Sequence, residues 1–170
     1  MKAVRSEGRI LLCEGYKDVL AFHASGIRYA VGLCGTALTE EHIRAIRRLA
    51  GQVTLSLDPD PAGRQNTVRC AHMLLSEGCA VSLLPLPDGM DPDEVYRRKG
   101  SDELARLARE GTLDYLSYRI RQAASRPHTD TAAINGTLGE IGLLSSPLAV
   151  YRRIGELSGA TGIPIEVLRQ

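Results

Sequence analysis

Three features that mark other classes of protein are missing from this sequence. No apolar run approaches the ~20 residues that a membrane-spanning helix needs, and no signal peptide is recognisable, so we expect a cytoplasmic protein without membrane contact. The four cysteines form no Cys-x-x-Cys pair and the four histidines are scattered, which argues against a zinc site. The formal net charge is only +1, so the chain as a whole has no general attraction to nucleic acid.

The chain has an ordinary globular composition, arranged in alternating segments. Its 170 residues, 44% of them apolar, are enough for one domain and a smaller appendage. Strand-like and helix-like runs alternate in the first half, which predicts an α/β fold: a parallel sheet of about four strands with helices on both faces. The expected strands are 10–13, 28–33, 52–57 and 81–84, and the expected helices lie around 19–22, at 40–50 and at 61–77.

From about residue 100 onward the pattern is helical throughout. Apolar residues there recur at helical spacing, and no strand-like run interrupts them. We therefore divide the chain into a first domain, residues 1–99, and a helical subdomain, residues 100–170. The expected elements of the subdomain are helices at 101–110 and 112–124, a linker at 125–131 that contains Pro127, helices at 131–141 and 147–158, and a last turn from 164.

Two aspartates mark the end of the third expected strand. Asp58 and Asp60 stand two positions apart, and in an extended segment residues at that spacing point the same way. Two converging carboxylates are what Mg²⁺ or Mn²⁺ requires. An equally good explanation of Asp60 alone is that it caps the helix that begins at Pro61. Asp58 has no such role, and a carboxylate that ends an apolar strand is costly unless something compensates it.

A third acid occupies the equivalent place after the first strand. Glu14 directly follows the apolar run 10–13, at the carboxyl end of a strand, where open α/β sheets bind their ligands. Taken alone, Glu14 is also explained as an acid that complements the dipole of the next helix. Together with Asp58 and Asp60, a shared metal site is the better interpretation.

Three motifs in this order resemble the Toprim domain, and within it the domain of DnaG-type bacterial primases. The motifs are Glu-Gly-Tyr-Lys-Asp at 14–18, Gly-Thr-Ala-Leu-Thr at 35–39 and Asp-Pro-Asp-Pro-Ala-Gly-Arg at 58–64, and a fourth segment, Leu-Pro-Asp-Gly-Met-Asp-Pro-Asp-Glu at 86–94, points to primases. The resemblance is strong over residues 8–100 and weak beyond them. It implies a Toprim fold with Glu14, Asp58 and Asp60 as catalytic and metal-binding residues.

The fourth segment has two readings. Asp91 fits a helix N-cap before Pro92, with Asp93 in the first turn of the helix, and this local explanation is sufficient by itself. The resemblance gives the other reading, in which Asp91 and Asp93 help to hold a second Mg²⁺ or Mn²⁺. Five carboxylates around one pocket would repel one another unless cations were bound.

The sequence departs from the family pattern around the acids. Pro59 and Pro61 stand where the family has glycine or polar residues, which leaves backbone contacts to a phosphate there in doubt. Lys17 replaces an apolar residue, and its charge either lies near the substrate or is simply solvated. Arg64 either contacts phosphate or lies on the solvent face of its helix.

The resemblance implies nucleotidyl transfer in RNA primer synthesis. Ribonucleoside triphosphates, a single-stranded DNA template and an RNA primer are then the expected partners; a replicative helicase is a further one that no motif identifies. The zinc-binding and basic domains that precede Toprim in primases have no counterpart in the sequence, so we expect a fragment or a short stand-alone relative. The alternatives are a Mg²⁺-dependent Toprim nuclease and a non-catalytic module that binds nucleotides or proteins.

Overall fold

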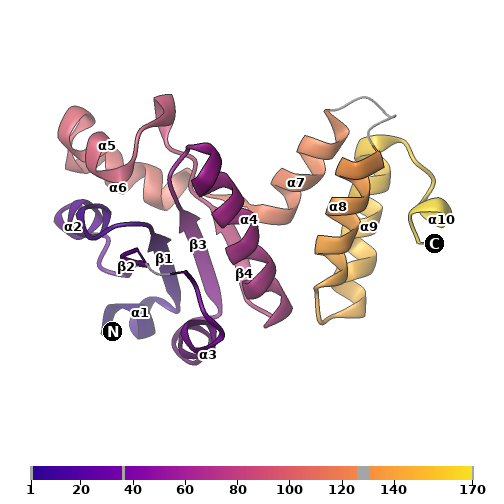
Figure 1. The fold of residues 1–170 in the computed structure, drawn as a ribbon, viewed down its shortest axis with the longest axis horizontal. Coiled ribbons are helices and arrows are strands. Elements are labelled where there is room, and N and C mark those ends of the chain that lie inside the picture. Colours follow the sequence, from indigo (N-terminus) through magenta and orange to yellow (C-terminus); the bar gives the residue numbers. More distant parts are fainter. Residues whose placement is uncertain (1, 36, 126–130, 170) are drawn as a thin grey trace. The chain divides into compact units, whose positions relative to one another are not determined.

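The computed structural model describes residues 2–35, 37–125 and 131–169. The chain divides into two compact units, residues 1–113 and 114–170, each of which is described by itself (Figure 1). The predicted linker at 125–131 falls almost wholly outside the described residues, as does Thr36 of the Gly-Thr-Ala-Leu-Thr motif.

The first unit is built on a sheet with the strand order β2-β1-β3-β4-β5. Strands β1, β2, β3 and β4 pair in parallel, with Cys13 of β1 level with Ser56 of β3. The predicted parallel α/β fold is thus confirmed, with one strand more than expected. The strands are β1 (Arg9–Cys13), β2 (Ala30–Gly32), β3 (Gln52–Ser56), β4 (Ala80–Leu83) and β5 (Leu113–Asp114).

Helices cover both faces of this sheet. Strand β2 lies on one side of β1, and β3 and β4 lie on the other side. Right-handed crossovers therefore place the helix between β1 and β2 on one face of the sheet and the next two helices on the other face. In agreement, α2 packs with α5 and α6, whereas α4 packs on β3, β4 and α3 (Figure 1). The helices are α1 (Lys2–Glu7), α2 (Tyr16–Ala24), α3 (Glu40–Leu49), α4 (Pro61–Ser76), α5 (Pro92–Lys99) and α6 (Ser101–Glu110), with the 3₁₀ turn η1 (Pro87–Gly89).

Local signals fix where these helices begin. The hydroxyl of Thr39 accepts a hydrogen bond from the amide of His42 and caps α3, while Asp60 and Asp91 cap α4 and α5 through their carboxylates. Each of these caps satisfies an amide that the first turn of a helix leaves without a partner. The cap readings of Asp60 and Asp91 are therefore confirmed, which is compatible with either residue also binding a metal.

Two parts of the predicted pattern are wrong. The short helix α1 was not expected; it forms because Val4 is buried against the sheet. The helix expected at 112–124 begins only at Tyr115, because Leu113 and Asp114 form strand β5 and Asp114 accepts a hydrogen bond from the amide of Ser117. Helix α6 packs with α2 and α5 in the first unit, and the domain boundary expected after residue 99 stays a prediction.

The second unit is helical, and a buried ion pair links two of its helices. Arg119 Nη1 lies 2.6 Å from Glu140 Oε1, and the hydroxyl of Tyr115 donates to the same oxygen at 3.1 Å. Burial and the Glu140 carboxylate raise the pKa of Tyr115, which keeps its hydroxyl protonated. Its helices are α7 (Tyr115–Ala124), α8 (Thr131–Gly142), α9 (Pro147–Thr161) and α10 (Ile165–Leu168).

Among the described residues, none of the helices has both the length and the apolar character to span a bilayer. All four cysteines are free thiols, and Cys13, Cys70 and Cys79 are buried. The three buried cysteines therefore serve as small apolar core residues.

Candidate metal centre

Glu14 and Asp58 lie together at the switch point of the sheet. Glu14 follows β1 and Asp58 follows β3, the neighbouring strands from which the chain continues in opposite directions. The amide of Asp58 donates a hydrogen bond to Glu14 Oε2 at 3.2 Å. The two motifs, 44 positions apart in the sequence, thus meet at one edge of the sheet.

Negative charge accumulates around Asp58. Its pKa is raised to about 6, first because burial penalises the charged form and then because Glu14, Asp18, Asp91 and Asp60 surround it with carboxylates. Each of these charges disfavours ionisation of Asp58, and a bound cation would have the opposite effect. The carboxylates from three separate motifs therefore act on a single group.

Asp60 is held beside Asp58 by the start of α4. Its Oδ1 accepts a hydrogen bond from the amide of Gly63 at 2.6 Å, and its side chain is exposed to solvent. Gly63 is essential to this turn, because a Cβ there would lie 2.1 Å from the backbone oxygen of Asp58. We call Glu14, Asp58 and Asp60 the acidic site.

Asp18 is a residue of this region that the sequence analysis did not single out. It is only 6% exposed, and its Oδ2 accepts a hydrogen bond from the amide of Gly15 at 2.9 Å. Burial is the main cause that raises its pKa, and the charges of Asp91 and Asp93 raise it further. The available signal was its spacing, because Asp18 lies on the buried stripe of α2 with Ala21 and Phe22.

The predicted second acid pair starts helix α5. Asp91 Oδ1 accepts a hydrogen bond from the amide of Glu94 at 2.7 Å, while Asp93 makes an ion pair of 2.9 Å with Arg97. Asp91 raises the pKa of both Asp58 and Asp18, so it belongs electrostatically to the region of the acidic site. The carboxylate of Asp93 is partly neutralised by Arg97.

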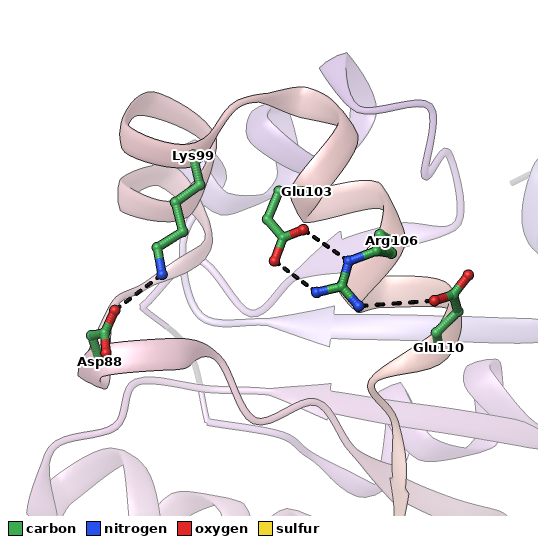
Figure 2. A network of polar contacts seen from close by, with 5 residues as sticks. All are labelled: Asp88, Lys99, Glu103, Arg106 and Glu110. Atoms are coloured by element: carbon green, nitrogen blue, oxygen red, sulfur yellow. Dashed lines mark hydrogen bonds and ion pairs between the residues drawn. The ribbon is translucent and has the colours of Figure 1, made fainter.

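The loop before α5 is tied to the other end of that helix. Lys99 Nζ lies 3.0 Å from Asp88 Oδ2, and Figure 2 shows the lysine reaching across to the loop. Asp88 itself has a positive φ of 58°, a conformation that asparagine and aspartate tolerate better than most residues. The ion pair thereby holds the segment that carries Asp91 and Asp93.

Arg64 and Lys17 are the two residues for which the sequence predicts contact with phosphate. Arg64 donates a hydrogen bond through Nη1 to the carbonyl oxygen of Pro59, so its guanidinium folds back onto residues 58–60, which we call the acidic turn. Lys17 is exposed near the start of α2. Contact of either residue with phosphate stays a prediction.

The acidic residues fit a divalent cation by charge and by donor type. All of them offer carboxylate oxygens, the ligands that Mg²⁺ and Mn²⁺ prefer, and burial together with the neighbouring carboxylates raises the pKa of Asp58. No three His, Cys, Asp or Glu side chains within residues 2–35, 37–125 and 131–169 are arranged to share an ion, however. Glu14 and Asp60 are instead turned toward backbone amides. Coordination of an ion would require these carboxylates to turn.

Known proteins resemble this chain in sequence and in fold. A family model described as Toprim-like matches residues 11–96, about half of the chain. The DNA primase of Halalkalibacterium halodurans is 37% identical over 119 residues, which are 70% of this chain and 20% of that protein. The chain thus spans about a fifth of the length of the curated relatives that it matches.

Solved primase structures share the fold. The structure of the zinc-binding and RNA polymerase domains of Aquifex aeolicus primase aligns with a TM-score of 0.85 at 29% identity, and the alignment covers 98% of this chain and 40% of that one. A DnaG primase catalytic domain bound to single-stranded DNA aligns with a TM-score of 0.77 at 26% identity, over 96% of this chain and 56% of that one. The similarity therefore extends through both units, well beyond the residues that the family model matches.

Proposed function

The chain belongs to the Toprim-like family, and on that premise we propose that it is the metal-binding catalytic part of a DNA primase. Its reaction is the addition of ribonucleotides to an RNA primer on a single-stranded DNA template, in the cytoplasm. The observation that carries the proposal is the meeting of Glu14 and Asp58 at the switch point, where burial and then the surrounding carboxylates raise the pKa of Asp58 to about 6. A bond to phosphate formed at that edge of the sheet requires cations that these acids are suited to hold.

The proposed roles follow from position. Asp58 and Asp60 would hold one Mg²⁺ or Mn²⁺ with Glu14, and Asp91 and Asp93 would hold a second on the nucleotide side. Bound divalent ions lower the pKa of the attacking hydroxyl and neutralise charge on the leaving pyrophosphate. Asp93 now pairs with Arg97, and this ion pair would have to open for Asp93 to hold an ion.

The chain's own residues then orient the reacting groups. The 3′ hydroxyl of the primer attacks the α-phosphate of a ribonucleoside triphosphate, its proton leaves, and the bond between the α-phosphate and pyrophosphate breaks. Glu14, with one oxygen already engaged by the amide of Asp58, either ligates an ion or takes that proton. Arg64, released from the Pro59 carbonyl, would bind phosphate through charge-assisted hydrogen bonds.

Related primases support the proposal, although this chain matches only part of their length. A related catalytic domain has been solved with single-stranded DNA, which supports a nucleic-acid template for this chain as well. The relatives in sequence are DNA primases, and they are about five times longer than the matched part. The proposal therefore assigns to this chain only the catalytic acids.

A chimera tests the proposal. The homologous segment of the Halalkalibacterium halodurans primase is replaced by this chain, and template-dependent incorporation of labelled ribonucleotides is measured with Mg²⁺ or Mn²⁺. We expect primer synthesis by the chimera and a loss of at least about a hundredfold with Asp58→Asn, since a lost metal ligand costs several kcal/mol in the transition state. Asp102→Asn, an exposed acid in the first turn of α6, should leave the rate unchanged.

The same experiment separates the rival functions. A folded chimera that nicks plasmid DNA without nucleotides and incorporates none would assign a nuclease site. A folded chimera that binds nucleotides, incorporates none and is insensitive to Asp58→Asn would assign a non-catalytic module. Either result would contradict the proposal.

A further inference from the structure

A polar pocket lies at the edge of the sheet opposite the acidic site. It has a volume of about 210 Å³ and is formed by α1, the start of β1, the loop between α2 and β2, and the end of α6. Arg9 begins β1 and Glu14 follows its last residue, so roughly 15 Å of strand separates the pocket from the acids. The pocket is therefore a separate feature of the first unit.

Positive charge dominates the lining of this pocket. Arg9, Arg28 and Arg109 line it from three different segments, and Glu7 is the acid that accompanies them. Glu7 pairs with Arg9 at 3.2 Å, but neither Arg28 nor Arg109 makes an ion pair with any described residue. Arg28 and Arg109 are exposed to solvent, and their N–H groups are donors that an anion entering the pocket could accept from.

Arg109 lies close to the loop between α2 and β2. Gly26 has a positive φ of 80° and ends α2, and a Cβ added there would lie only 3.9 Å from Nη2 of Arg109. The guanidinium of Arg109 therefore lies close to the backbone of this loop. Arg28 follows two residues later in the same loop.

A buried hydroxyl in the pocket has no partner. Tyr29 is only 6% exposed, lines the pocket, and its OH makes no hydrogen bond within the described part of the chain. The guanidinium of Arg9 lies over its ring, 4.6 Å from the centroid. Burial raises the pKa of Tyr29, so the hydroxyl stays protonated and is a donor without an acceptor. Such a group calls for an explanation, because buried donors are almost always satisfied.

We propose that this pocket binds a small anion with a terminal phosphate group. Guanidinium groups bind phosphate oxygens through paired, charge-assisted hydrogen bonds, and the hydroxyl of Tyr29 would supply a further donor. A local hollow with three arginines suits a small anion better than the backbone of a nucleic-acid strand, which is followed by an extended basic groove. The pocket uses none of the residues of the acidic site, so anion binding there can be tested independently of primer synthesis.

Calorimetric titration with inorganic pyrophosphate tests this site. The whole chain is used in the presence of EDTA, so that pyrophosphate does not bind through metal ions at the acidic site. We expect saturable binding that is weakened at least about tenfold by Arg109→Gln, which removes a charged donor, and several-fold by Tyr29→Phe, which removes only the hydroxyl. Arg44→Gln makes the same change of net charge on exposed α3 and should leave the affinity unchanged.

Three outcomes would overturn the proposal. One is the absence of saturable pyrophosphate binding, which would leave an ordered water as the partner of Tyr29. Another is equal binding by the parent chain and Arg109→Gln, with unchanged thermal unfolding to show that the variant is folded. The third is binding only of an oligonucleotide with a 5′-hydroxyl, lost with Arg109→Gln, which would assign the pocket to backbone phosphodiesters.

Discussion

The amide of Asp58 donates a hydrogen bond to the carboxylate of Glu14 across 3.2 Å and thereby joins the ends of β1 and β3. This contact places the first acid of one motif against the first acid of another. Burial is the main cause that raises the pKa of Asp58, and Glu14 is the largest of the charges that raise it further. The relationship between these two residues leads to the first prediction.

Stability of the metal-free chain should fall as the pH rises through the titration of Asp58. The pKa of its carboxyl is raised from 3.8 to about 6 in the folded state, so the folded state holds this proton more tightly than the unfolded state. The stabilisation of the fold by the protonated Asp58 carboxyl is therefore complete below about pH 4 and is lost as the pH rises through about 6. Urea unfolding in EDTA should show that the free energy of unfolding of Asp58→Asn rises relative to that of the parent chain as the pH increases over that range.

The control for this prediction is Mn²⁺. A cation stabilises the ionised form of Asp58, so adding Mn²⁺ should favour the parent chain over Asp58→Asn at pH 7. An advantage of the variant that did not depend on pH would show that the carboxyl of Asp58 has an ordinary pKa.

Asp18 should contribute to stability through its hydrogen bond and to Mn²⁺ binding through its charge. Asp18→Asn keeps an acceptor for the amide of Gly15 but removes the charge, whereas Asp18→Ala removes both. We expect the asparagine variant to be more stable than the alanine variant by about 1 kcal/mol. Both should bind Mn²⁺ several-fold more weakly than the parent, since a negative charge near the acidic site is lost. Thermal unfolding in EDTA and calorimetry measure the two effects, and equal stability of the variants would contradict the assigned hydrogen bond.

Gly63 should tolerate no side chain. In Gly63→Ala the new Cβ would approach the backbone oxygen of Asp58 to 2.1 Å, so the acidic turn or α4 must shift. We expect a loss of about 2 kcal/mol or more in the free energy of unfolding, together with weaker Mn²⁺ binding. Gly139→Ala makes the same chemical change in α8, where nothing lies within 4 Å, and should stabilise the chain by about 0.5–1 kcal/mol. A stable Gly63→Ala variant with full metal affinity would refute the close approach.

The buried ion pair of the second unit should matter far more than an exposed one. Arg119→Leu removes the cation from Glu140, which is only 2% exposed, and should cost about 3–5 kcal/mol of unfolding free energy. The matched comparison is Arg106→Leu on α6. Arg106 makes two hydrogen bonds to Glu103, at 2.8 and 2.7 Å, and an ion pair with Glu110, all at the surface (Figure 2). Its replacement should have a much smaller effect on urea unfolding; similar losses for the two variants would be inconsistent with the burial of Glu140.

The sequence predicted the fold wherever the signals were local. Asp60 and Asp91 cap their helices as expected, because an N-cap depends only on the next three residues. Helix α1 and strand β5 were missed, since six and two residues carry little pattern of their own. These two elements are held by tertiary packing, of which the burial of Val4 is an example.

The candidate site was predictable to a similar extent. The rule that parallel strands end at one edge of a sheet was enough to bring Glu14 to Asp58. It could not give the buried position of Asp18, the ion pair between Asp93 and Arg97, or the turn of Arg64 back to Pro59. Those details depend on which side chain faces which neighbour, and residue spacing alone does not determine this.

Anomalous diffraction from a crystal of the chain soaked with Mn²⁺ tests the metal centre most directly. The account predicts an anomalous peak within about 2.5 Å of carboxylate oxygens of Glu14 and Asp58, with Asp60 turned from the amide of Gly63 toward the ion. Ordered carboxylates at this edge of the sheet without a peak at saturating Mn²⁺, or peaks only at acids elsewhere, would contradict it.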